Sequence, residues 1–342
     1  MAQSVARPRT APLTCPGHTR PVVHLEYSEK QDDGTFVLLS SCKDGNPMLR
    51  DWLGDWVGTF LGALWDDLRN AGHKGAVWSA KLSGGAAARA ATGSADFSAK
   101  VWDTYTGECA QTFTHNHIVR SVAINHAGSQ LLTGGHEKKL RIFDLQHMSG
   151  SSADHAQLFK RSAGCDQGTT HSGTIRSVVL GHGTSGAENI VVTAAEDKCL
   201  QWWDLRTLAP VHEVTLDEPL TSMDRCVGTY GEYITVTSGK QAIFMDLLSH
   251  EIVKKHTLDI TPSSIYLHPT NPDRFVAGNT GDEWVRVYDY EDANLLDLHK
   301  GHHGPVHCVS YTPDGEVAAS GSEDGTIRLW QVNPGTKYGL WT

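Results

Sequence analysis

Short runs of alternating hydrophobic and polar residues recur along the whole chain, and turn residues separate them. The segment from Gly301 to Gln331, GHHGPVHCVSYTPDGEVAASGSEDGTIRLWQ, shows the order most fully. A Gly-His pair precedes an alternating strand, a Pro-Asp-Gly turn, a strand of small residues, an Asp-Gly turn, and a strand that ends in an aromatic and a polar residue. Each part is a strand or hairpin signal, so the segment predicts an antiparallel unit of short strands.

The same order occurs seven times, and it is weaker in the two copies that end in AIFMD and VRVYD. Four of the six intervals between successive copies match the period of about 40–45 residues of a four-stranded propeller blade. We therefore predict an all-β fold, a single seven-bladed β-propeller over residues 10–341, preceded by a flexible segment at residues 1–9. The copies close at Asp51, Asp103, Asp144, Asp204, Asp246, Asp289 and Gln331, with intervals of 52, 41, 60, 42, 43 and 42 residues.

Two intervals are too long, and an insertion accounts for each. In the first, the residues ALWDDLRNAG at positions 63–72 interrupt an ordinary junction between two blades. Leu64, Trp65 and Leu68 would share one side of a short helical turn, which would suit a clamp on a partner. A lineage-specific loop or a gene-model artefact is the alternative. In the second, the Ser/Gly/His-rich stretch at about 146–170 has the composition of a surface loop.

The start of the chain is expected to close the ring. If residues near Thr10 to Cys15 form the outer strand of the last blade, no unpaired strand edge remains between the first and last blades. The closed ring then forms one structural unit, and we expect a monomeric propeller that acts within a larger complex.

The composition excludes several classes of protein. The chain has 39 acidic and 29 basic residues and a net charge of −10, so no overall positive field attracts it to nucleic acid or anionic lipid. The 7 cysteines are never spaced C-x-x-C, which argues against a disulfide framework and a zinc ribbon. The N-terminus has no apolar signal-peptide core, and no run of about 18 apolar residues occurs. We expect a cytoplasmic and nuclear protein without direct nucleic-acid or membrane partners.

A set of four residues recurs at matching offsets in three copies, and in these residues the sequence resembles the WD-repeat family. In that family such residues form a buried relay of hydrogen bonds from indole through hydroxyl and imidazole to carboxylate. Such a relay satisfies polar groups inside a low-dielectric stack and fixes the turns. The sets are His302, Ser320, Asp324 and Trp330; His73, Thr92, Asp96 and Trp102; and His171, Thr193, Asp197 and Trp203.

Other chemical interpretations of these residues are weaker. A Ser-His-Asp triad needs one exposed nucleophile beside a base, whereas this arrangement is repeated, as a structural part would be. The clusters His115 to His117 and His302-His303 have no cysteine or carboxylate at ligand spacing. The run Gly181-His182-Gly183 lacks the Lys-Ser/Thr ending of a phosphate loop and indicates a turn. We therefore expect no enzyme activity, no catalytic residue, no cofactor and no metal.

Three copies lack part of the relay set. The first has Arg50 where the aromatic residue belongs, and the third has Glu137 in place of the aspartate. The fifth, from Thr237 to Asp246, lacks both the Gly-His pair and the Asp-Gly turn. These blades should depend more on apolar burial and on their neighbours.

One face of the ring is the expected partner-binding site. In WD-repeat proteins the face with the Gly-His and Asp-Gly turns commonly binds partners, and the residue five positions past each histidine should lie near its rim. A Trp beside two Arg on consecutive blades has the composition of an interface hot spot. The alternative is that Trp78 packs between blades and the arginines are solvated. The positions are Val23, Trp78, Arg120, Arg176 and His307, with Thr221 and Ser263 in the weak blades and Trp65 of the insertion on the same face.

Several stretches point to a narrower resemblance. CKDGNPMLRDW, the TFLG before the insertion and HKGAVW after it, SADFSAKVWDTYTGE, LLTGGHEKKLRIFDL and the terminal KYGLW together resemble the serine/threonine kinase receptor-associated protein (unr-interacting protein) family. The resemblance implies a non-enzymatic adaptor that joins the survival-motor-neuron complex through Gemin proteins and serves small nuclear ribonucleoprotein assembly and mRNA splicing. In animals it also implies binding to transforming-growth-factor-β receptors and inhibitory Smads.

The alternative family is the small WD-repeat subunit of translation initiation factor three, a related propeller with similar Gly-His motifs. The stretch CKDGNPMLR in the first copy and the YGLW ending favour the first resemblance. Both resemblances imply a binding platform rather than an enzyme.

Overall fold

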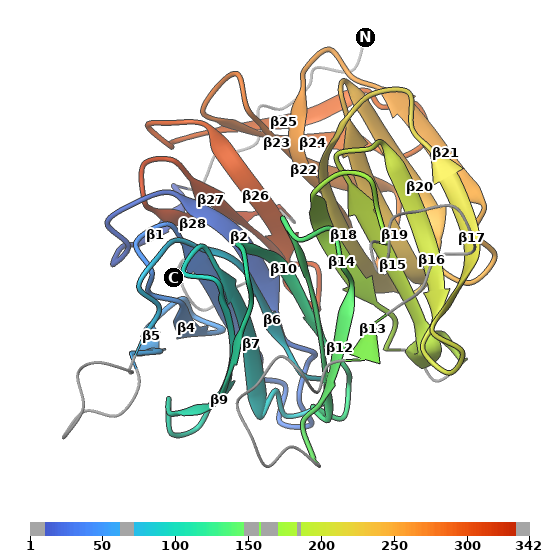
Figure 1. Cartoon of the computed structure of the whole chain (residues 1–342). Coiled ribbons are helices and arrows are strands. Elements are labelled where there is room, and N and C mark those ends of the chain that lie inside the picture. The colour runs from blue at the N-terminus through green and yellow to red at the C-terminus, as the bar shows by residue number, and fades with distance from the viewer. Residues whose placement is uncertain (1–10, 62–71, 147–156, 159–169, 183–185, 333–342) are drawn as a thin grey trace, which may run out of the picture.

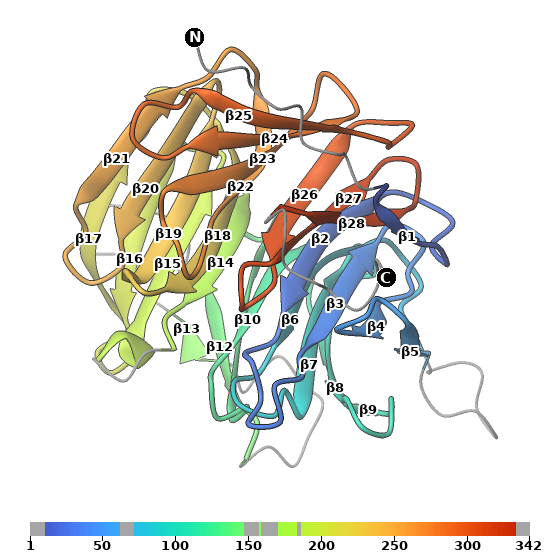
Figure 2. The same cartoon turned by 180° about the vertical axis from the view of Figure 1, so that it is seen from behind.

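The computed structural model describes residues 11–61, 72–146, 157–158, 170–182 and 186–332. These residues form seven antiparallel four-stranded sheets, the blades, and the prediction of a seven-bladed β-propeller is confirmed. Figures 1 and 2 show the blades arranged around a central axis, with the first strand of each repeat innermost. Among the described residues, no helix combines the length and apolarity needed to cross a membrane.

The strands follow the repeat pattern of the sequence. The blades, each given from its innermost to its outermost strand, are blade one, β2 (Val22–Tyr27), β3 (Val37–Cys42), β4 (Met48–Asp51) and β5 (Trp56–Thr59); blade two, β6 (Val77–Leu82), β7 (Arg89–Ser94), β8 (Ser98–Asp103) and β9 (Cys109–Thr114); blade three, β10 (Val119–Ile124), β11 (Gln130–Gly135), β12 (Arg141–Asp144) and β13 (Gln157–Leu158); blade four, β14 (Ile175–Leu180), β15 (Ile190–Ala195), β16 (Cys199–Asp204) and β17 (Ala209–Thr215); blade five, β18 (Leu220–Gly228), β19 (Gly231–Ser238), β20 (Gln241–Asp246) and β21 (Ile252–Thr257); blade six, β22 (Pro262–Leu267), β23 (Arg274–Asn279), β24 (Trp284–Asp289) and β25 (Leu295–Lys300); and blade seven, β26 (Val306–Tyr311), β27 (Val317–Ser322), β28 (Ile327–Gln331) and β1 (Leu13–Cys15). A short 3₁₀ helix, η2 (Ala187–Asn189), precedes β15.

The N-terminal strand closes the ring. β1 pairs antiparallel with β28, with Leu13 opposite Leu329 and Cys15 opposite Ile327, as expected for the stretch from Thr10 to Cys15. In both views the blue strand β1 lies beside the red strand β28. The last blade therefore takes its outer strand from the start of the chain, and every blade has a neighbour on each side.

Small residues in the second strand of each blade let the sheets pack closely. A Cβ atom on Gly93 would lie 2.9 Å from Cγ1 of Val119 in the next blade, and one on Gly321 would lie 2.6 Å from Cγ1 of Val22. The innermost valines therefore fill space that a larger residue in these strands would occupy. This explains why the second strands contain Gly, Ala, Ser and Thr although they are buried on both faces.

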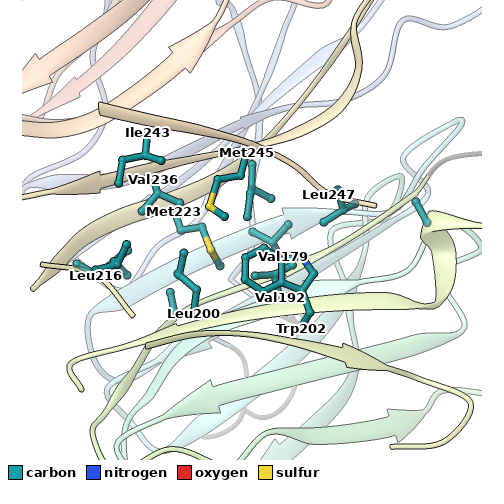
Figure 3. Close-up of a cluster of buried hydrophobic side chains, with 14 residues drawn as sticks. Val179, Val192, Leu200, Trp202, Leu216, Met223, Val236, Ile243, Met245 and Leu247 are labelled. Carbon is teal, nitrogen blue, oxygen red and sulfur yellow. The ribbon is translucent and has the colours of Figure 1, made fainter. Parts of the chain in front are cut away.

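The hydrophobic core lies between adjacent blades rather than at the centre of the ring. Figure 3 shows the cluster between blades four and five, where Trp202, Leu200 and Val192 face Met223, Val236 and Met245. Trp202 is fully buried, and similar clusters join the other neighbouring blades. Burial of apolar surface between blades contributes about 25 cal/mol for each Å² removed from water.

Parts of both predicted insertions lie outside the described residues, as do residues 1–9. Of the stretch at positions 63–72, only Gly72 is described, so the helical turn with Leu64, Trp65 and Leu68 stays a prediction. The stretch at about 146–170 contributes the strand β13, which pairs with β12. The prediction that this stretch is a loop was therefore incomplete, because a strand of two residues has no alternation to read.

Candidate partner-binding site

A β-bulge in every innermost strand builds this site. Near the start of each of these strands the pairing with the second strand shifts register, for example between Val77 and Ser79 and between Val119 and Ser121. A bulge leaves one residue out of the ladder and redirects its side chain. The skipped residues are Val23, Trp78, Arg120, Arg176, Thr221 and His307, and in blade six both Ser263 and Ser264.

These skipped residues are the positions that the repeat spacing placed at the rim, and all of them line one cavity of about 400 Å³. In blades one to four and seven the innermost strand follows the loop that carries the relay histidine, and the cavity opens between these loops at the mouth of the central channel. The structure therefore brings together all the described residues of the predicted face. It does not describe Trp65.

Trp78 and Arg120 form the central contact of the cavity wall. The guanidinium carbon of Arg120 lies 3.7 Å from the centroid of the indole ring of Trp78, and Lys43 Nζ lies 5.8 Å from it. A cation over an indole face is attracted by its electrons, by about 0.5–2 kcal/mol. Burial, together with the positive charge of Arg176, lowers the pKa of Arg120 to about 10, so Arg120 stays charged at neutral pH.

The other basic side chains at the rim have carboxylate partners. Arg176 donates to Glu196 Oε1 from Nε at 2.9 Å and from Nη2 at 2.6 Å. His307 Nε2 lies 2.5 Å from Glu323 Oε2, and Lys43 Nζ lies 3.8 Å from the same oxygen. The arginines are therefore neither fully solvated nor equivalent, because Arg176 is paired and Arg120 is stacked.

A cluster of charged residues lies on the innermost strands of blades one, two and five. Lys81 Nζ lies 3.5 Å from Glu26 Oε1 and 3.5 Å from Asp224 Oδ1, and His24 Nε2 lies 3.2 Å from the same aspartate oxygen. Burial alone would raise the pKa of Asp224, but the charge of Lys81 and the hydrogen bond from His24 lower it. This channel cluster joins blades that are far apart in the sequence.

In each complete blade, the relay hydrogen bonds connect the loop before the innermost strand to the turn between the second and third strands, and both border the cavity. In blade seven, Trp330 Nε1 donates to Ser320 Oγ at 2.7 Å, His302 Nε2 lies 2.7 Å from that hydroxyl, and His302 Nδ1 lies 3.1 Å from Asp324 Oδ2. A carboxylate can only accept, so Nδ1 carries the proton and the hydroxyl donates to Nε2. Each relay thus ties a Gly-His loop to the turn between the second and third strands.

Blades two and four contain the same relay. Trp102 Nε1 donates to Thr92 at 2.8 Å, and the corresponding bond from Trp203 to Thr193 is 2.9 Å. The imidazoles of His73 and His171 bridge these hydroxyls to Asp96 and Asp197, with Nε2 to hydroxyl distances of 2.6 and 2.7 Å. Thr92, Thr193 and Ser320 are 0% exposed, so no substrate reaches these hydroxyls, and the arrangement acts as a structural support.

The incomplete blades use substitute contacts. In blade one, His18 still bridges Ser40 and Asp44, while Arg50 donates to the carbonyl oxygens of Pro16 and Gly54. In blade three, His115 bonds Thr133 at 2.9 Å, and Glu137 pairs with Arg141 and accepts from the Asn116 N–H. In blade five, Thr237 accepts from the Ser222 N–H, and in blade six Asp282 pairs with Arg286 at 2.6 Å.

One group of side chains in the described residues has metal-ligand geometry. The ligand atoms of His18, Cys42 and Asp44 lie within 4.8 Å of one another. His18 and Asp44 already form a relay bond, and the Cys42 thiol donates to the Arg20 carbonyl. Burial raises the pKa of Cys42 to about 12, which keeps the thiol protonated and opposes metal binding.

The repeat pattern did not reveal several residues of the site. Lys43, Lys81 and Asp224 line the cavity but lie at positions without a repeat signal. His182, expected only in a turn, accepts from Arg225 and contacts the Ile124 carbonyl, so it joins blades three, four and five. Burial and the charge of Arg225 lower its pKa to about 3. A search for charges at innermost-strand positions would have found two of these residues, Lys81 and Asp224.

The fold, the relays and the repeat spacing define a WD-repeat propeller, a class of protein-binding scaffold. The family model of the WD domain, G-beta repeat, matches residues 67–103, 107–144 and 294–331. The chain is 40% identical over 341 residues to the serine-threonine kinase receptor-associated protein of Bos taurus, and the aligned region covers 97% of this chain and 86% of the bovine protein. It is 37% identical over 325 residues to the protein of that name in Dictyostelium discoideum, covering 94% and 98% of the two chains.

The chain therefore belongs to the serine-threonine kinase receptor-associated protein family. Similarity to the eukaryotic translation initiation factor 3 subunit I of Culex quinquefasciatus is more distant, with 24% identity over 342 residues and coverage of 93% and 95%. The family resemblance stated from the sequence motifs is confirmed.

Proposed function

We propose that this chain is a non-enzymatic adaptor that binds partner proteins at the mouth of its channel. The observation that carries the proposal is the set of bulges, which turns at least one side chain from each blade, including the stacked pair Trp78 and Arg120, into a single cavity. Relays hold the bordering loops, so the site is preorganised and loses little conformational entropy on binding. Aromatic and arginine side chains at the centre of a rigid face are typical binding hot spots.

We further propose that the partners are Gemin-type subunits of the survival-motor-neuron complex, so that the chain acts in small nuclear ribonucleoprotein assembly and mRNA splicing in the cytoplasm and nucleus. The support is family membership at 40% identity along nearly the whole chain. The name of these relatives also supports a role in receptor signalling, as part of the same proposal. The 24% identity to the initiation factor subunit keeps translation as the competing function for the test to decide.

The test is affinity purification of the tagged chain from its own cells, followed by mass spectrometry. We expect the variant Arg120→Glu with Arg176→Glu to lose its partners, because it reverses the charges of both arginines that line the cavity, while its melting temperature stays within a few degrees of wild type. Arg206→Glu is the matched control. Arg206 lies after β16, at the other end of blade four from the cavity, and its side chain is 69% exposed.

Each outcome decides a different part of the proposal. Capture of Sm-ring assembly factors by wild type and by Arg206→Glu, but not by the double variant, supports the whole proposal. Capture of initiation-factor-three subunits instead would move the function to translation. Equal capture by the double variant would refute the binding site. Deletion of residues 63–72 in the same assay decides between the clamp and the loop interpretations of the insertion.

A further inference from the structure

A row of three rings on blades two and three lies near Arg120, whose charge acts on one of them, His136. The ring of Phe97 lies 5.5 Å from that of His117, and the His117 and His136 rings stack at 4.9 Å with an interplanar angle of 14°. Phe97 and His136 come from the turns between second and third strands, and His117 comes from the loop before β10. Burial and the charges of His117 and Arg120 lower the pKa of His136, which keeps its ring neutral at pH 7.

Phe97 occupies a position that favours glycine. Its φ is 66°, and the equivalent turn residues in blades one, five and seven are Gly45, Gly239 and Gly325, with φ between 56° and 90°. A bulky side chain in this left-handed region is strained, by about 1–3 kcal/mol. Phe97 is nevertheless 44% exposed, so this strained turn presents an aromatic surface to solvent.

The guanidinium of Arg120, near these rings, has N–H groups available as hydrogen-bond donors. Among the described residues it has no hydrogen-bond or ion-pair partner, and its contact is the face of Trp78. The nearby carboxylates are engaged, since Glu196 pairs with Arg176 and Glu323 pairs with His307. The indole N–H of Trp78 is also buried without a partner. A half-buried guanidinium with unfilled donors gains most from an anionic acceptor.

The charge of the cavity agrees with this requirement. Its lining residues include Lys43, Lys81, Arg120 and Arg176, and the one carboxylate among the lining residues, in the described part of the chain, is Asp224. Carboxylates next to the lining residues pair with three of these cations, Glu26 with Lys81, Glu196 with Arg176 and Glu323 with Lys43, so Arg120 is the lining cation without a carboxylate partner in the described part of the chain. An unpaired cation in a cavity favours an acidic segment of a partner over a neutral one.

We infer that the channel mouth binds an acidic side chain, Asp or Glu, of a partner peptide, with its carboxylate on Arg120 and an adjacent apolar side chain over Phe97, His117 and His136. This inference rests on the proposed function and adds the chemistry of the partner. A carboxylate fits better than a phosphate dianion. In the described part of the cavity, only the guanidinium of Arg120 offers a free pair of parallel N–H donors, because the neighbouring Arg176 already pairs with Glu196.

The probe is a phage-displayed library of random peptides, selected on wild type, Arg120→Met, Phe97→Gly and the control Arg206→Met. We expect peptides from wild type and the control to be enriched in Asp or Glu beside a large apolar residue. Arg120→Met should lose the acidic enrichment. Phe97→Gly should lose the apolar enrichment while its melting temperature stays equal or rises, because glycine relieves the strained turn.

The best wild-type peptide is then synthesised with its acid as Glu, Gln or phosphoserine, and binding is measured by fluorescence polarisation. We expect about tenfold weaker binding for Gln, as for loss of one charge-assisted hydrogen bond. Tighter binding of phosphoserine by the same factor would overturn the carboxylate assignment. Enrichment without acids, or none at all, would overturn it too. If native partners are then still lost from the double-charge variant, the proposed function stands without this inference.

Discussion

Asp324 shows how one side chain holds the border of the binding site. Its carboxylate accepts from His302 Nδ1 and from the backbone N–H groups of His303 and Thr326, and it also accepts from the Thr326 hydroxyl at 2.7 Å. Burial alone would raise the pKa of Asp324, but the bonds from His303 and Thr326 and the nearby His302 lower it to about 2. Two loops of blade seven therefore depend on one ionised group.

We expect Asp324→Ala to lower the free energy of unfolding by about 1–3 kcal/mol at pH 7, because it leaves buried donors unsatisfied. A depressed pKa stabilises the fold above the unfolded pKa of about 4, and this stabilisation is lost as pH falls through the folded pKa. Wild type should therefore lose more stability than Asp324→Ala between pH 4 and pH 2. Urea unfolding at several pH values measures both effects.

The exposed Asp32→Ala serves as the control, since its side chain should change neither quantity. If Asp324→Ala and wild type lose stability in parallel below pH 4, the carboxylate is not the source of the acid sensitivity. A neutral effect at pH 7 would contradict the relay in blade seven.

Residue-level prediction from the sequence succeeded where a position repeats and failed where it does not. The relay residues recur at fixed offsets, so the sequence placed His73, Asp96 and their equivalents in hydrogen-bond distance. The repeat spacing placed the skipped positions at the rim, but the bulge itself has no residue-type signal, because the skipped residue is Val, Trp, Arg, Thr, Ser or His. The strained φ of Phe97 was equally hidden, since neighbouring blades place glycine or lysine there.

At the scale of the element, the strand β1 determines whether the ring is closed. Cys15 is 3% exposed and packs in the cluster that joins blades seven and one, with Val22, Leu25 and Leu329. Thr14, the residue before it, is exposed on the other side of the same strand. The strand therefore carries a closing contact on one face only.

We expect Cys15→Asp to lower the free energy of unfolding by about 3 kcal/mol or more, because it places a carboxylate in an apolar cluster between two blades. Thr14→Asp adds the same charge to the exposed face of the same strand and should change stability by less than about 0.5 kcal/mol. Thermal and urea unfolding of both variants measure the difference. Equal stability of the two variants would show that β1 does not close the ring.

The strands themselves were largely predictable, and the exceptions have physical causes. Alternation and turn residues marked the strong blades, and the closing strand followed from the need to pair the last edge. The weak blades five and six keep the four-stranded pattern through other contacts, such as Thr237 with Ser222 and Asp282 with Arg286. β13 has two residues, too few to show a period, so the sequence indicated only a loop there.

At the scale of the whole molecule, the channel cluster links blades that the ring otherwise connects only through their neighbours. His24 and Asp224 are 200 positions apart, and Lys81 lies 3.5 Å from the same aspartate. Their side chains are 15–18% exposed, so solvent screens the charges only in part. Lys81, His24 and Asp224 line the same cavity as Trp78 and Arg120, and their contacts connect the innermost strands of blades one, two and five.

A double-mutant cycle tests this role. Asp224→Leu leaves Lys81 and His24 without their shared acceptor, so we expect it to lower the free energy of unfolding by about 1–3 kcal/mol. Lys81→Met removes the cation that loses this acceptor, so the double variant should be more stable than the sum of the single changes by about 1 kcal/mol. Urea unfolding measures all four proteins, and 1 M salt should reduce the coupling because the groups are partly solvated. Additive effects would mean that Lys81 and Asp224 act independently and that burial between the blades alone holds the channel together.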